Sequence, residues 1–122
     1  MRILILEDDG TRVNNFIELL HTHDLDITEN ANEAIHLLET NVYDIILLDH
    51  DLGEGNGTGG LVSSYLSMFP ENLNYKADIV IHSWNTPAAM NMQKDLPQAT
   101  WAAYNTEEFY DVLVNGILRR GS

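Results

Sequence analysis

Short apolar runs alternate with segments of helical periodicity along the whole chain, and this alternation is the strongest constraint on the fold. The runs are Ile3 to Leu6, Leu25 to Thr28, Tyr43 to Leu48, Ile79 to Ile81 and, more weakly, Ala99 to Tyr104. Apolar strands separated by helices are typical of parallel sheets that are covered on both faces. The pattern predicts an α/β fold, with a doubly wound five-stranded parallel sheet in a three-layer α/β/α arrangement.

The segments between the runs carry the marks of helices. Apolar residues recur at helical spacing after the first, second, third and last runs, and Asn30 and Thr106 stand where N-caps are expected. Pro87 suits the first turn of a helix, and Pro70 ends the one before it. No linker, repeat or low-complexity segment divides the chain, so residues 1–122 are expected to form one domain.

The charge and cysteine content exclude several classes of function. The net charge is −13, from 19 acidic residues against 6 lysines and arginines, which disfavours binding to duplex DNA. The chain has no cysteine, which excludes disulfides and thiolate metal sites and fits a reducing cytoplasm. The first apolar run is too short for a signal peptide or a membrane span, so no membrane association is expected.

Acidic side chains follow the apolar runs where a doubly wound sheet binds its ligands. Asp8 and Asp9 come after the first run, and Asp49 comes directly after the third. Two carboxylates ~4 Å apart repel each other by about 4 kcal/mol at an effective dielectric of ~20, and a bound cation removes that cost. Oxygen ligands favour Mg²⁺ or Mn²⁺, so Asp8, Asp9 and Asp49 are predicted metal ligands. The alternative is that Asp8 and Asp9 only cap the following helix.

Two histidines also follow strand ends at this edge. His50 and His82 are candidates for the general acid or base, because imidazole titrates near neutral pH, although a lone histidine is more often a packing residue. Ser83 and Asn85 are able to hold a phosphate, or they only form a turn. Five glycines between Gly53 and Gly60 let backbone N–H groups approach an anion, or they only form a linker.

These residues resemble the receiver domains of response regulators, which have a flavodoxin-like fold. The resemblance implies that the acids after the first strand hold Mg²⁺, that Asp49 accepts a phosphoryl group, and that Ser83 contacts it. Two features depart from the receiver pattern. The segment after Asp49 lacks Met-Pro, and Asn105-Thr106 stands where receivers carry Lys-Pro. The lysine that normally neutralises the acyl phosphate is therefore missing.

A narrower resemblance is to the cyclic-phosphate-processing receiver group. It rests on the segments "LDHDLG" and "HSWN", on Thr58-Gly59, and on Asn91-Met92. It implies action on a cyclic phosphate of a nucleotide or an RNA end, with a divalent metal as cofactor. The predicted catalytic residues are Asp49, His50 and His82. The predicted substrate-binding residues are Asp51, Gly53, Thr58, Gly59, Ser83 and Asn85.

Two other functions remain open at this point. The chain could be a phosphoacceptor switch in two-component signalling, with Asp49 as the phosphorylation site. It could also be a non-catalytic module that sequesters a nucleotide or contacts a protein. A protein partner would meet the fifth strand and the last helix, where Trp101 and Tyr110 lie, although both residues also suit packing.

Overall fold

Five parallel strands form a single sheet in the order β2-β1-β3-β4-β5, so the predicted doubly wound α/β fold is confirmed. The structure is a computed structural model that describes residues 1–121. The strands are β1 (Arg2–Leu6), β2 (Asp24–Thr28), β3 (Ile45–Leu48), β4 (Asp78–Ile81) and β5 (Thr100–Trp101). The helices are α1 (Gly10–Leu20), α2 (Ala31–Thr40), α3 (Gly59–Met68), η1 (Leu73–Lys76), α4 (Thr86–Asp95), α5 (Glu107–Tyr110) and η2 (Asp111–Leu118).

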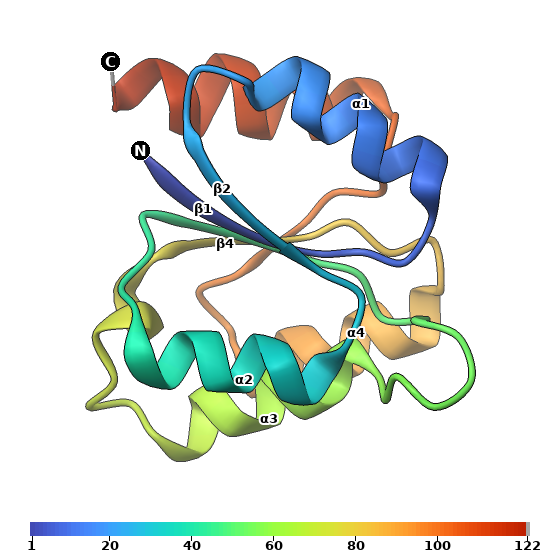
Figure 1. The fold of residues 1–122 in the computed structure, drawn as a ribbon, viewed down its shortest axis with the longest axis vertical. Coiled ribbons are helices and arrows are strands. Elements are labelled where there is room, and N and C mark those ends of the chain that lie inside the picture. Colours follow the sequence, from blue (N-terminus) through green and yellow to red (C-terminus); the bar gives the residue numbers. More distant parts are fainter. Residues whose placement is uncertain (122) are drawn as a thin grey trace.

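The helices form two layers on opposite faces of the sheet (Figure 1). α1 and the C-terminal helix cover one face, and α2, α3 and α4 cover the other. The strands alternate between the two cores, because Ile3 and Ile5 pack on the side of α1 whereas Leu4 and Leu6 pack on the side of α2. This two-sided burial explains why the strands are apolar throughout.

The predicted helix boundaries follow from capping side chains. Asn30 accepts a hydrogen bond from the backbone N–H of Glu33, and Thr106 accepts one from Phe109, so both predicted N-caps are confirmed. Pro87 lies in the first turn of α4. None of the helices among residues 1–121 is long and apolar enough to cross a membrane.

Three elements differ from the sequence-based expectation. β5 spans two residues, against the run from Ala99 to Tyr104, and the 3-10 helix η1 was not expected. The last helix widens into the π-helix η2 after Tyr110. Its buried residues Phe109, Leu113 and Ile117 are four apart. That spacing lies between the turn of an α-helix and the wider turn of a π-helix, so the apolar pattern did not separate the two.

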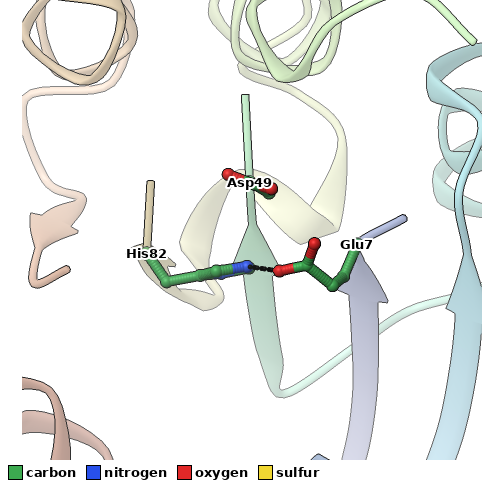
Figure 2. A group of neighbouring side chains, drawn as sticks. All are labelled: Glu7, Asp49 and His82. Carbon is green, nitrogen blue, oxygen red and sulfur yellow. Dashed lines mark hydrogen bonds and ion pairs between the residues drawn. The ribbon is translucent and has the colours of Figure 1, made fainter. Parts of the chain in front are cut away.

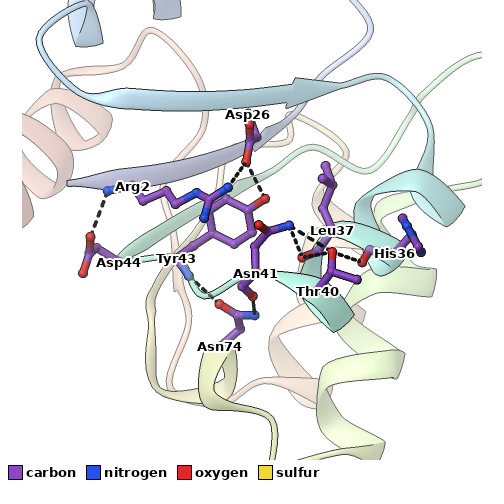
Figure 3. Close-up of polar contacts among 9 residues, drawn as sticks. All are labelled: Arg2, Asp26, His36, Leu37, Thr40, Asn41, Tyr43, Asp44 and Asn74. Atoms are coloured by element: carbon purple, nitrogen blue, oxygen red, sulfur yellow. Dashed lines mark hydrogen bonds and ion pairs between the residues drawn. The ribbon is translucent and has the colours of Figure 1, made fainter.

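A polar network lies at the end of the sheet where β1 and β3 begin (Figure 3). The Tyr43 hydroxyl donates to Asp26 Oδ2 at 2.7 Å, and the Arg2 guanidinium lies over the Tyr43 ring and contacts the same carboxylate. The buried side chain of Asn74 accepts from the backbone N–H of Tyr43 at 2.7 Å. This network fixes the entry into β3, whose other end carries the site described below.

We expect Tyr43→Phe to lower the free energy of unfolding by about 1 kcal/mol, because it removes the hydrogen bond to Asp26. Urea denaturation measures the change. Tyr75→Phe is the matched control, since among the described residues the hydrogen bonds of Tyr75 run through its backbone. Equal losses in both variants would contradict the assigned role of the Tyr43 hydroxyl.

Candidate functional site

The register of the sheet brings one polar residue from each of three strands to the same point. Leu6 of β1 pairs with Leu48 of β3, and Leu48 pairs with Ile81 of β4. The next residues along the chain are Glu7, Asp49 and His82, and all three are buried. One ligand atom from each lies within 4.8 Å of the other two, and Figure 2 shows the three side chains converging.

The Glu7 carboxylate is surrounded by donors. Oε1 accepts from His82 Nε2 at 2.9 Å and lies 3.7 Å from Arg12 Nη1, while Oε2 accepts from the backbone N–H groups of Asp8 and Asp9 at 3.1 Å each. Burial alone would raise the pKa of Glu7, but the hydrogen bond and charge of His82, together with the Asp9 amide, lower it to about 2. Glu7 is therefore ionised at neutral pH.

The His82 ring lies beneath this carboxylate and out of contact with solvent. Its edge packs against Phe16, with ring centroids 5.2 Å apart, and among residues 1–121 its Nδ1 has no hydrogen-bond partner. Because Glu7 is a carboxylate, Nε2 is assigned as the N–H that donates to it. His82 therefore helps to hold the Glu7 carboxylate in place.

Asp49 has the opposite electrostatic character from Glu7. Burial and the neighbouring Glu7 charge raise its pKa to about 6, although the charge of His82 and a hydrogen bond from the His50 backbone N–H oppose the rise. Two adjacent carboxyl groups with widely separated pKa values can divide the roles of fixed anion and proton-exchanging group.

A cavity of about 210 Å³ opens above these side chains, at the carboxyl ends of the strands. Arg12 of α1 is the positively charged side chain in its wall. The lining residues are Glu7, Asp8, Asp9, Arg12, Asp49, Asp51, Ser83, Trp84 and Asn85. The structure therefore places Asp8, Asp9, Asp49, Asp51, Ser83 and Asn85, all singled out from the sequence, around one cavity.

The two acids that follow Glu7 have different surroundings. Asp9 Oδ1 accepts from the backbone N–H of Arg12 at 2.9 Å, so Asp9 caps α1, as the alternative interpretation of the sequence held. Asp8 also faces the cavity, and burial together with the charge of Glu7 raises its pKa. The assignment of Asp8, Asp9 and Asp49 as metal ligands stays a prediction, and Glu7 is the acid that the structure adds beside Asp49.

His50 lies at the rim, where it forms part of a chain of polar contacts. Its Nδ1 is 2.8 Å from Asp51 Oδ1, and the hydrogen bond from His50 lowers the pKa of Asp51. Asn85 Nδ2 donates to the same carboxylate at 3.3 Å, while Asn85 Oδ1 caps α4 at the N–H of Ala88. His50 and His82 are not among the residues that line the cavity, and their catalytic roles stay predictions.

The glycine-rich loop turns away from the cavity and packs on the start of α2. Gly53, Gly55 and Gly57 all have positive φ, and Asn56 O accepts from the backbone N–H of Ala31 at 2.9 Å. Gly53 borders Asp8, whereas Thr58 stands at the N-cap position of α3. The structure does not bring Gly53, Thr58 or Gly59 into the cavity wall.

Gly59 has a separate structural reason to be glycine. A Cβ at this position would lie 1.9 Å from the backbone oxygen of Asp49. Its N–H also donates to His50 O at 2.9 Å. Gly59 therefore lets α3 begin directly against the backbone that carries Asp49.

Three residues of the cavity wall, Glu7, Arg12 and Trp84, were not predicted from the sequence. Glu7 is the first polar residue after its apolar run, as Asp49 and His82 are after theirs, so applying that one criterion to every run would have found it. Arg12 does not follow an apolar run, so this criterion would not have found it. Its guanidinium lies 4.9 Å from the centre of the Tyr104 ring, which follows β5, and only the packing of α1 on the sheet places it there.

Comparisons with known proteins identify the family and the fold. The family described as cyclic-phosphate processing receiver domain matches residues 2–98. A response regulator receiver domain protein (CheY-like) from Methanospirillum hungatei aligns with a TM-score of 0.73 at 14% identity, covering 98% of this chain and 95% of its own. The response regulator TrrA from Thermotoga maritima, solved in complex with Mg(2+)-BeF, aligns with a TM-score of 0.71 at 18% identity, covering 93% and 96%.

A two-component response regulator from Clostridium difficile also aligns, with a TM-score of 0.75 at 22% identity, covering 100% of this chain and 98% of its own. No curated protein matches the sequence. The structural likenesses establish the receiver fold, and the family match extends over most of the chain, including every strand end that contributes to the cavity. The chain belongs to the cyclic-phosphate processing receiver domain family.

Proposed function

We propose that this protein opens a cyclic phosphate on a nucleotide or RNA end in a metal-dependent hydrolysis. The observation that carries the proposal is Asp49, a buried carboxyl group with a pKa raised to about 6 at a cavity that also presents a serine and an arginine. In the reaction, water oxygen bonds to phosphorus, one bridging P–O bond breaks, and the water proton ends on the released hydroxyl. A group that titrates near neutral pH is suited to carry that proton.

The donor set fits a hard divalent cation. Carboxylates of Glu7, Asp8 and Asp49 lie at or beside the cavity, and oxygen ligands suit Mg²⁺ or Mn²⁺. His82 suits direct ligation less well, because its Nε2 donates to the Glu7 carboxylate and would have to give up that hydrogen bond to bind a cation. When bound, the cation would polarise a phosphate oxygen and neutralise the clustered carboxylates. Glu7 would stay ionised under His82, and Ser83 and Arg12 would contact the phosphate.

The test is incubation with 2′,3′-cyclic nucleotides, a cyclic-phosphate-ended oligonucleotide and ADP-ribose cyclic phosphate, with and without EDTA. The proposal expects ring opening that stops with EDTA and returns with added Mg²⁺ or Mn²⁺. Tight binding of these compounds without turnover would instead indicate a sequestering module. No binding and no turnover with any of them would overturn the proposal.

A second candidate is a phosphoacceptor switch, favoured by the place of Asp49 at the end of β3 in a receiver fold. Among the residues that the structure describes, no lysine lines the cavity, and Arg12 reaches it from α1. Incubation with a small phosphodonor such as acetyl phosphate, followed by intact-mass measurement, tests this candidate. A stable phosphoryl group on Asp49, together with no ring opening, would favour the switch over the enzyme.

We expect Arg12→Ala to raise KM for the cyclic phosphate about tenfold, because a charged hydrogen bond to the phosphate is lost. Steady-state kinetics measure the change, and Arg12→Lys should recover part of it. Arg120→Ala is the matched control. It also removes one positive charge, but Arg120 pairs with Asp78 at the other end of the sheet. Equal changes in KM for Arg12→Ala and Arg120→Ala would show that only net charge matters.

A further inference from the structure

Trp84 is a large aromatic side chain left exposed at the cavity. It directly follows Ser83, lines the same cavity, and remains 59% exposed. Its indole N–H donates to the backbone oxygen of Tyr104 at 3.0 Å, which fixes the ring between the ends of β4 and β5. A held indole with an open face is suited to stacking on a planar group, because little conformational freedom is lost on binding.

The cavity is small, so a planar group that stacks on Trp84 would lie at its rim. A volume of about 210 Å³ is below the roughly 300 Å³ at which pockets begin to enclose drug-sized ligands. The phosphate of a nucleotide must lie by the acids, Ser83 and Arg12 for the proposed reaction. The base would then lie toward the rim, where Trp84 is the exposed aromatic side chain of the cavity wall.

The charge distribution limits how many phosphates the ligand carries. Arg12 is the cation of the cavity wall, and the whole chain has a net charge of −13. One phosphate can be balanced by Arg12 and a bound cation. Further phosphates of an RNA strand would extend over an acidic surface that supplies no compensating cations at the cavity.

We infer that the substrate is a nucleoside cyclic phosphate with a single phosphate group, whose base stacks on the indole of Trp84. This inference rests on the proposed function for the reaction, but the stacking itself is a binding event that needs no turnover. The site would therefore prefer mononucleotides to RNA ends, and nucleotides to cyclic phosphates that lack a base.

The binding test uses tryptophan fluorescence with Mg²⁺ present. Titration with adenosine 3′-monophosphate should quench the emission of Trp84, and glycerol phosphate at equal concentration should not. In Trp84→Phe the quenching should disappear, while the emission of Trp101 remains as an internal reference. Equal quenching in Trp84→Phe and in the unmodified protein would overturn the inference, and so would equal quenching by the base-free phosphate.

The kinetic test compares kcat/KM for adenosine 2′,3′-cyclic phosphate with that for glycerol 1,2-cyclic phosphate. Trp84→Ala should lower this ratio about tenfold or more, and Trp84→Phe should retain most of it. Met90→Ala, which removes an exposed apolar side chain of α4 outside the cavity wall, is the control and should leave the ratio unchanged. An unchanged ratio in Trp84→Ala would overturn the inference, as would faster turnover of a cyclic-phosphate-ended oligonucleotide than of the mononucleotide.

The two tests separate this inference from the proposed function. Quenching by the mononucleotide without turnover of any cyclic phosphate would contradict the enzyme and support the base site. Metal-dependent turnover with an unchanged ratio in Trp84→Ala would support the enzyme and contradict the base site.

Discussion

Gly59→Ala is expected to lower the free energy of unfolding by about 3 kcal/mol or more, the largest loss of stability that we predict for a single methyl group in this protein. The added Cβ would meet the backbone oxygen of Asp49 at 1.9 Å and its carbonyl carbon at 2.9 Å. Neither atom can move without shifting the end of β3. Chemical denaturation measures the loss.

Gly10→Ala is the matched control for this substitution. Gly10 lies in the first turn of α1, and a Cβ there would meet no atom within 4 Å. Because alanine is the better helix former, this variant should be neutral or more stable by up to about 1 kcal/mol. Similar unfolding free energies for the two variants would contradict the close approach of α3 to Asp49.

Asp49→Asn is expected to abolish turnover and, at the same time, to raise the free energy of unfolding at pH 7.5 by about 2 kcal/mol. The pKa of Asp49 is raised to about 6 in the folded protein, above its usual value near 4. The folded state therefore holds a proton in this interval that the unfolded state releases, and stability falls as the pH rises through it. Asparagine carries no charge and avoids this loss.

Denaturation at pH 4 and pH 7.5 measures the effect, which should be small at pH 4 and full at pH 7.5. Glu7 acts in the opposite direction, since its lowered pKa stabilises the fold above about pH 4.5 and this stabilisation is lost as the pH falls toward 2. Both proteins retain Glu7, so its contribution largely cancels in the comparison. A variant that is less stable than the unmodified protein at pH 7.5 would contradict the raised pKa of Asp49.

Magnesium provides the control for the metal part of the proposal. A cation that binds among the carboxylates should raise the melting temperature of the unmodified protein, because a ligand of the folded state stabilises it. The same addition should have a smaller effect on Asp49→Asn, which lacks one carboxylate ligand. An equal response in the two proteins would indicate that magnesium binds elsewhere.

The sequence was sufficient to predict most of the strands and helices, because the spacing of apolar residues and the capping side chains act locally. Ile3 to Leu6 is apolar throughout because helix layers bury both faces of this strand, and Asn30 begins a helix through one side-chain hydrogen bond. The site was less predictable. Three consecutive acids follow β1. Which of them points inward depends on the register of β1 against β3, because a shift of one residue turns each side chain to the other face.

Other parts of the site depend on packing between distant segments. Arg12 reaches the cavity because α1 packs beside Tyr104, and the exposure of Trp84 depends on where β4 and β5 end. The glycines between Gly53 and Gly60 were expected either to let backbone N–H groups approach an anion or to form a linker. Asn56 of this loop bonds to Ala31 at the start of α2, a contact that no local pattern in the loop reveals.

The register of β1, β3 and β4 couples formation of the site to formation of the native sheet. Glu7, Asp49 and His82 come from points about forty and thirty residues apart, and only the hydrogen-bonded ladder sets them side by side. A chain that has collapsed but slipped by one residue in β1 would present Asp8 where Glu7 belongs. Recovery of activity during refolding should therefore report correct strand alignment rather than mere compaction, and partly assembled molecules should be inert.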